Sequence, residues 1–206
     1  MIDIVDAKFI TSAPNVKAAP PSEKQNEVVF MARSNAGKSS LLNALTNHKN
    51  LAKVSSTPGK TKLINYFDVT FMDRETKEKL TAKFVDLPGF GYAKVSKSQK
   101  GEWEKNLTDY IKKRDQIKIF IHLIDSRHPE LEIDKGVYNF LLEHAKPNQV
   151  ILQVFTKTDK LNQKELSALK RKYPGALMVS SSKKRGIKEL TKIIYDVLHG
   201  QSDAED

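Results

Sequence analysis

One short segment constrains the fold of this chain more than any other. Residues 27–33 read EVVFMAR, an apolar run of strand length bounded by polar residues. It leads directly into ARSNAGKS at positions 32–39, and leucines at helical spacing follow. A strand, a Gly-Lys-Ser loop and a helix in this order predict a phosphate-binding loop, because consecutive backbone N–H groups can surround a phosphate at the positive end of a helix.

The residues of this loop have distinct chemical tasks. Lys38 is predicted to reach the β- and γ-phosphates of a nucleotide, and the Ser39 hydroxyl to ligate Mg²⁺. The usual first glycine is Ala32 here. Because alanine restricts φ, we expect a slightly altered loop geometry without loss of binding. A coincidental turn is the alternative, and the strand–loop–helix context argues against it. The predicted phosphate contacts are Ala32, Arg33, Ser34, Asn35, Ala36, Gly37, Lys38 and Ser39.

A second loop can add an acid and a backbone donor. The strand pattern LTAKFVDL at 80–87 is followed by proline and glycine. The Asp86 carboxylate would hold Mg²⁺ through water, and Gly89 would let a backbone N–H approach the γ-phosphate. This short motif is common by itself, but its place after a strand and downstream of the phosphate loop makes it specific. The predicted contacts here are Asp86, Leu87, Pro88 and Gly89.

A proline-glycine loop at 56–62 lies between these two segments. It carries several hydroxyls, and Thr61 is a candidate second hydroxyl ligand of the metal. Taken alone, this loop would be interpreted as an ordinary turn before a strand. The predicted contacts are Gly59, Lys60, Thr61, Lys62 and Leu63. We predict Lys38, Thr61 and Gly89 as the catalytic groups, and Ser39 and Thr61 as the direct metal ligands.

The segment Thr156-Lys157-Thr158-Asp159 follows the apolar strand pattern QVILQVF and predicts which base is bound. Asp159 can accept hydrogen bonds from the N1–H and 2-amino groups of guanine, whereas adenine would leave it unpaired. The aliphatic stem of Lys157 can lie over the purine ring. A third patch, Val179-Ser180-Ser181, could offer a backbone N–H to guanine O6. Loops that follow successive strands fit ligand binding at the carboxyl ends of a parallel sheet.

The remaining patterns predict an α/β fold. Strand and helix patterns alternate from residue 100 onward, which indicates a mostly parallel sheet, and a charged turn near residue 75 indicates a hairpin with one antiparallel edge strand. The predicted helices begin near 37, 96, 132, 163 and 186, and the first is expected to continue to 51. We predict a nucleotide-binding domain at 27–199. An N-terminal extension at 1–26 would pack on it, and an acidic flexible tail would occupy 200–206.

The charge of the chain points to a polyanionic partner. Lys and Arg number 35 against 25 Asp and Glu, a formal net charge of +10. This favours nucleic acid before anionic membranes, with a merely soluble basic protein as the alternative. Basic clusters lie at 112–114, 170–172 and 183–185, and Lys94, Lys97 and Lys100 form another. They lack interleaved aromatic residues, so attraction to phosphate backbones is favoured over sequence readout.

Composition narrows the chemistry further. The chain has no cysteine, which excludes disulfides, zinc–thiolate sites, iron–sulfur clusters and cysteine nucleophiles. No apolar run approaches the roughly 18 residues of a membrane span, and the first residues lack the layout of a secretory signal. We therefore expect a cytoplasmic protein with no membrane span.

The ordered segments ARSNAGKS, TPGKT, DLPG, TKTD and SS resemble the translation-factor-class GTPases of the Era/EngA group. DLPGFGYAKVSK, TPGKTKLINYF and AKFITSAP are closely similar to the EngB (YihA/YsxC) family of ribosome-assembly GTPases, and the resemblance runs from Ala7 to Leu198. It implies a P-loop GTPase fold, with a six-stranded sheet and about five helices, that binds GTP or GDP with Mg²⁺. It also implies a monomer that matures the large ribosomal subunit and serves normal cell division and septation. Ala32 and Val179 depart from the family's usual glycine and phenylalanine.

Hydrolysis is expected to be slow in the free protein. Phe90 follows Gly89 where a Ras-like enzyme has a water-orienting glutamine, so a partner would complete the site. The resemblance also places a potassium ion beside Asn35, whereas a need for a particular loop conformation would equally explain an asparagine there. Two alternatives remain open: a P-loop ATPase or kinase, and an RNA-binding module whose nucleotide site is only structural.

Overall fold

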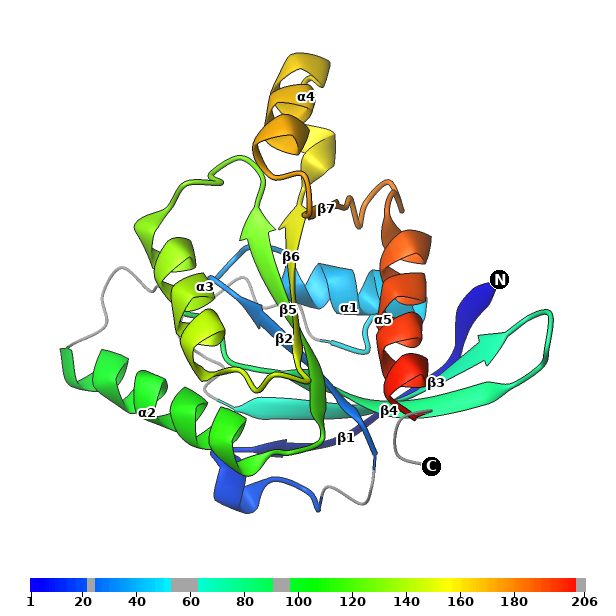
Figure 1. Cartoon of the computed structure of the whole chain (residues 1–206), viewed down its shortest axis with the longest axis vertical. Coiled ribbons are helices and arrows are strands. Elements are labelled where there is room, and N and C mark those ends of the chain that lie inside the picture. Colours follow the sequence, from blue (N-terminus) through cyan, green and yellow to red (C-terminus); the bar gives the residue numbers. More distant parts are fainter. Residues whose placement is uncertain (22–24, 53–62, 91–96, 203–206) are drawn as a thin grey trace.

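The computed structural model describes residues 1–21, 25–52, 63–90 and 97–202, which form a twisted sheet covered by helices on both faces (Figure 1). The strands are β1 (Ile2–Ala13), β2 (Glu27–Ala32), β3 (Ile64–Asp73), β4 (Lys79–Asp86), β5 (Ile117–Asp125), β6 (Val150–Thr156) and β7 (Leu177–Met178). The helices are α1 (Lys38–Thr46), α2 (Lys97–Lys113), α3 (Glu132–His144), α4 (Gln163–Lys172) and α5 (Ile187–Ser202), with short 3-10 turns η1 (Val16–Ala18) and η2 (Thr158–Lys160).

The sheet has the order β1-β3-β4-β2-β5-β6-β7. Its five strands from β4 to β7 run parallel, and β3 is antiparallel to both β4 and β1. The mostly parallel sheet with five α-helices and the hairpin near residue 75 are confirmed. Two expectations need correction: there are seven strands rather than six, and the antiparallel strand β3 is not at the edge. The reason is β1, which pairs along β3 from Ile2 opposite Asp73 to Ala13 opposite Ile64.

The core has two layers, one on each face of the sheet. Helices α1 and α5 pack on one face and α2 and α3 on the other (Figure 1). Every residue of β2 and β5 is buried, as expected for central strands of a parallel sheet that is covered on both sides. Because β2 and β5 are paired in parallel, their C-terminal ends lie at the same end of the sheet, where the predicted loops emerge.

Helix α1 ends at Thr46, five residues before the predicted end. Asn47 adopts a left-handed conformation with φ 54°, and its N–H bonds to carbonyls of the last helical turn. Beyond it, the Asn43 side chain bonds both the N–H of Ala52 at 2.8 Å and its carbonyl at 2.9 Å. Ala52 is therefore buried although the helix has ended, because hydrogen bonds with Asn43 hold the following turn against the core. A buried apolar residue beyond Thr46 does not indicate further helix.

A buried ion pair anchors the start of β2. The Glu27 carboxylate is fully buried and contacts the Arg114 guanidinium at the end of α2. Tyr110 donates its hydroxyl to Glu27 at 3.0 Å, and Arg114 donates to the carbonyl of Pro20 at 3.0 Å. The prediction of an exposed basic cluster at 112–114 is therefore wrong for Arg114, which is buried. Within the described ranges, no helix is long and apolar enough to cross a membrane.

Candidate functional site

The phosphate loop joins β2 to α1. Ala32 is the buried last residue of β2 and has no positive φ, so alanine meets no backbone conflict at the position of the usual glycine. The turn is made by Asn35 and Gly37, with φ of 66° and 93°. Asparagine and glycine are the residues that tolerate this left-handed region. The conformational explanation for Asn35 therefore has direct support.

Lys38, the first residue of α1, extends to Asp86 at the end of β4, and Nζ contacts Oδ1. Both side chains are mostly shielded from solvent, with 14% and 8% of their surface exposed. Burial lowers the pKa of the Lys38 ammonium, and the adjacent carboxylate favours its charged form. Phosphate oxygens arriving at the loop would compete with Asp86 for this cation.

The segment after β4 lies directly against the phosphate loop. Ser34 N–H donates to the Phe90 carbonyl at 2.8 Å, and Phe90 N–H donates to the Ala32 carbonyl at 3.2 Å. A Cβ added to Gly89 would lie 3.3 Å from the Ser34 Cα, so a larger residue here would require the loop backbone to shift by a few tenths of an ångström. The Phe90 ring is buried and lies 5.4 Å from that of Trp103. Phe90 was predicted not to orient a water molecule, and a buried apolar ring is consistent with that prediction.

The predicted base loop is fastened to the phosphate loop. Thr156 Oγ1 donates to the Ala36 carbonyl at 2.5 Å, and Lys157 Nζ donates to the Asn35 carbonyl at 2.6 Å. Lys157 Nζ also lies 3.2 Å from Asp125 Oδ2. Burial opposes ionisation of Asp125, but hydrogen bonds from Arg127 and Lys157 outweigh it and hold the pKa of Asp125 below its usual range.

Asp159 is held by the loop that follows β7. Ser180 Oγ donates to Asp159 Oδ1 at 2.6 Å, and this hydrogen bond lowers the pKa of Asp159. Thr158 donates its backbone N–H and its hydroxyl to the Val179 carbonyl, at 3.2 and 2.9 Å. The two loops predicted to bind the base are therefore adjacent, and Ser180 restrains one oxygen of the Asp159 carboxylate.

Other predicted positions stand as follows. Gly59, Lys60, Thr61 and Lys62 lie outside the described residues, as does Lys94, whereas Leu63 is described and exposed. Asp125 was missed by the sequence reasoning. The pattern that identified Asp86 could also have identified Asp125, because each is an aspartate at the end of a buried strand.

The donor set around the loop suits magnesium. Among the described residues, no three His, Asp or Glu side chains gather as a ready metal site. Ser39 and Asp86 offer oxygen ligands only, which is the chemistry that Mg²⁺ prefers, and Mg²⁺ usually takes its remaining ligands from phosphates and water. These residues therefore fit a metal that arrives with the nucleotide.

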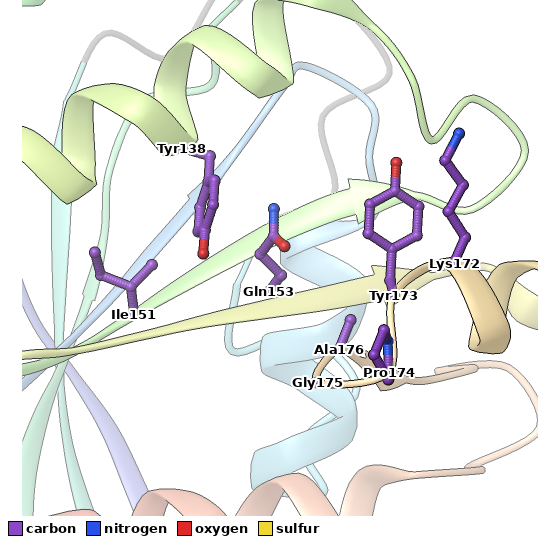
Figure 2. Close-up of a pocket in the computed structure, with 8 residues that line it drawn as sticks. All are labelled: Tyr138, Ile151, Gln153, Lys172, Tyr173, Pro174, Gly175 and Ala176. Carbon is purple, nitrogen blue, oxygen red and sulfur yellow. The ribbon is translucent and has the colours of Figure 1, made fainter.

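A pocket of about 280 Å³ lies elsewhere, beside the first half of β6. Figure 2 shows Tyr138 of α3 and Tyr173 of the α4–β7 connection on either side of Gln153. It includes none of the residues predicted to bind nucleotide. The Tyr173 hydroxyl donates to the Glu130 carboxylate. Because this polar group of the pocket already has a partner within the protein, we assign the pocket no ligand.

The fold and the loops at this sheet edge define a P-loop GTPase. The model of the family "50S ribosome-binding GTPase" matches residues 27–157. A protein of Aliarcobacter butzleri described as "Probable GTP-binding protein EngB" is 57% identical over 198 residues, covering 96% of this chain and 98% of that protein. A Campylobacter jejuni protein with the same description is 51% identical over 193 residues, covering 94% and 96%.

A solved structure shares the fold. The crystal structure of a probable GTP-binding protein EngB has a TM-score of 0.62 at 21% identity and covers 84% of this chain and 99% of its own. At that identity it supports the fold alone, while the sequence relatives establish the family. The chain therefore belongs to the EngB family of GTP-binding proteins.

Proposed function

We propose that this protein is a GTP-dependent switch that binds the large ribosomal subunit during its assembly and thereby supports normal cell division and septation. The observation that carries the proposal is the junction of Lys157 with Asn35, because it unites a guanine-type loop with a phosphate loop. The family description names a 50S ribosome-binding GTPase. A ribosomal partner would place the protein in the cytoplasm, and we propose that it acts there as a monomer.

In this function, each loop has a role toward GTP. Lys38 would bind the outer phosphates, and the Gly89 backbone N–H would contact the γ-phosphate. Asp159 would accept the guanine hydrogen bonds that adenine cannot make. Ser39 and Thr61 would ligate Mg²⁺, and Asp86 would hold it through water; the bound metal supplies positive charge that neutralises the phosphates.

We propose that intrinsic hydrolysis is slow and that a partner accelerates it. Phosphoryl transfer depends on positioning and charge stabilisation, including a group that orients the attacking water. Phe90 stands at the position where Ras-like enzymes carry such a group, and its ring is buried. A group supplied by the ribosomal particle would complete the site.

A potassium ion beside Asn35 belongs to the same proposal. Asn35 is an exposed residue of the loop, and its side-chain amide carries an oxygen that could ligate a cation. GTP turnover measured in potassium and in sodium salts at equal ionic strength tests this. Equal rates would leave conformation as the reason for asparagine.

The basic clusters are not equivalent as surfaces for RNA. Lys183, Lys184 and Arg185 are all exposed, and none forms an ion pair with an acid in the described part of the chain. In contrast, Lys172 is paired with Glu130 at 2.8 Å. We propose that 183–185 contributes most to phosphate-backbone contact, because these charges need not break an existing ion pair.

Sedimentation with ribosomal subunits tests the function. At fixed salt, the GTP-analogue form should bind large subunits more tightly than the GDP form, and neutralising 183–185 should reduce both binding and its salt dependence. Neutralising Lys112 and Lys113, two exposed lysines on α2, is the comparison variant and should reduce binding less. Equal co-sedimentation in both nucleotide states would reject the switch and favour an RNA-binding module with a structural nucleotide. Preference for ATP over GTP would favour the kinase or ATPase alternative.

A further inference from the structure

Three polar side chains on neighbouring strands form a line that ends at Asp86. Ser12 on β1 lies opposite Asn65 on β3, and Asn65 lies opposite Asp86 on β4. Cross-strand partners project from the same face of a sheet, so these three side chains are neighbours. Neither Ser12 nor Asn65 is among the residues that the sequence analysis placed at the nucleotide.

The hydrogen bonds along this line have one direction. Ser12 Oγ donates to Asn65 Oδ1 at 2.6 Å, and Asn65 Nδ2 donates to Asp86 Oδ2 at 3.4 Å. An amide has one oxygen and one NH₂ group. Because Ser12 engages the oxygen, the NH₂ group faces the carboxylate. The opposite orientation would place two oxygen acceptors against each other.

The two oxygens of Asp86 therefore have different partners. Oδ1 contacts Lys38 Nζ, and Oδ2 accepts from Asn65. If phosphates draw Lys38 away, Oδ1 becomes accessible to a metal-bound water, while Asn65 is still held opposite Asp86 by the pairing of β3 with β4. The contact of Asn65 with Oδ2 would then restrict rotation of the carboxylate at the moment when its orientation matters.

We propose that Asn65 is a positioning residue that orients Asp86 toward Mg²⁺, and that Ser12 fixes the orientation of the Asn65 amide. The inference rests on the proposed function, in which Asp86 holds the metal through water. Hydrogen bonds to a metal-holding carboxylate commonly tune metal affinity. Ser12 belongs to β1, which lies outside the residues 27–157 matched by the family model. The edge strand thus contributes to the site as well as covering β3.

The test separates a metal effect from a fold effect. Binding of a fluorescent GDP and of a non-hydrolysable GTP analogue to the full chain is measured during a Mg²⁺ titration and again with the metal removed by a chelator. Asn65→Leu should raise the Mg²⁺ concentration needed for half-maximal binding by roughly threefold, less than the roughly tenfold loss typical for a partner of a direct ligand, because Asp86 contacts the metal through water. The metal-free GDP affinity should stay at the wild-type value. Ser12→Ala should shift the same midpoint in the same direction by a smaller factor.

Thr70→Leu is the matched control. Thr70 is also a partly buried polar residue of β3, and its cross-strand partner is Thr81 rather than Asp86. It should leave the Mg²⁺ midpoint unchanged. A wild-type midpoint in Asn65→Leu, or an equal loss of affinity with and without metal, would overturn the inference. If Asn65→Leu fails to fold, the Ser12→Ala titration decides the outcome on the same criterion.

Asp86→Asn distinguishes failure of this inference from failure of the proposed function. If Asp86→Asn shifts the Mg²⁺ midpoint and Asn65→Leu does not, only the positioning role is rejected. If neither variant shifts it, the assignment of Asp86 to the metal fails first, and the positioning role fails with it.

Discussion

Lys157 Nζ donates to the backbone carbonyl of Asn35 at 2.6 Å, although the two residues are 122 positions apart in the chain. Thr156 reinforces the junction through its 2.5 Å bond to the Ala36 carbonyl. A Cβ on Gly37 would lie 3.6 Å from Lys157 Cε, so the lysine stem runs along the loop. The base loop and the phosphate loop therefore form one unit.

The first prediction concerns this junction. Lys157→Met retains an aliphatic stem but removes the bond to Asn35 and the ion pair with Asp125. Hydrogen bonds that involve a charged group contribute about 1.5–3 kcal/mol, and the partial exposure of Lys157 favours the lower end. We expect GDP to dissociate about tenfold faster, as measured by displacement of a fluorescent analogue. Preference for GDP over ADP should persist. A GDP dissociation rate equal to that of the wild type would contradict the role of Lys157 in this junction.

The second prediction concerns the base. Asp159→Asn should sharply weaken guanine nucleotides and shift preference toward xanthine, whose 2-oxo group accepts from the new amide. Competition of GDP and XDP for the same site measures the change. Unchanged GDP affinity would remove this loop from the base site.

The third prediction concerns pH. The Ser180 hydroxyl lowers the pKa of Asp159, so the ionised form that guanine requires persists as pH falls below the usual aspartate range. Ser180→Ala removes this stabilisation and raises the pKa of Asp159. The acid limb of GDP binding should therefore move to higher pH. Titrations from about pH 7 to about pH 2.5 span the usual aspartate pKa of about 3.9 and the region below it. A limb that does not move would show that Ser180 does not control the carboxylate.

The fourth prediction concerns stability. Glu27→Gln leaves the Arg114 guanidinium buried without its anionic partner, and breaking a buried pair typically costs about 3–5 kcal/mol. Urea unfolding should show this loss in the free energy of unfolding. Asp109→Asn is the control, because its ion pair with Lys113 is solvent-exposed at 3.9 Å and should contribute little. Equal effects of the two changes would contradict the anchoring role of Glu27.

The fifth prediction concerns the metal ligand. Ser39→Ala removes a predicted Mg²⁺ ligand, so affinity for GTP with Mg²⁺ should fall more than affinity for metal-free GDP. Lys38→Ala should instead remove most triphosphate affinity whether or not metal is present, because its charge acts on the phosphates. Wild-type binding by both variants would place the phosphate site elsewhere.

Much of the candidate site could be predicted because its loops are contiguous in sequence. The phosphate loop and the base loop each follow an apolar strand, so strand burial and loop chemistry appear in one short segment. Ser12 and Asn65 carried no such signal. Their relation to Asp86 depends on strand register, which is a property of pairing between distant segments.

Strand β1 also shows that local sequence patterns do not identify the distant segment with which a strand pairs. From the sequence, residues 1–26 were predicted only as an extension that packs on the domain, with no pairing partner for a strand within it. Pairing with β3 made β1 the seventh strand and moved β3 away from the edge. Similarly, the charges at 112–114 are alike in sequence, and only the packing of α2 against Glu27 made Arg114 an interior residue.

From residue types at fixed short spacings we predicted a phosphate loop, a guanine-binding segment and the family, and the sequence relatives confirm the family. The folded chain shows in addition which distant groups meet: Lys157 with Asn35, Ser180 with Asp159, and Ser12 with Asn65, which in turn contacts Asp86. The physical reason is that a loop's chemistry is local, whereas the orientation of a side chain is fixed by neighbours that strand order and register bring together.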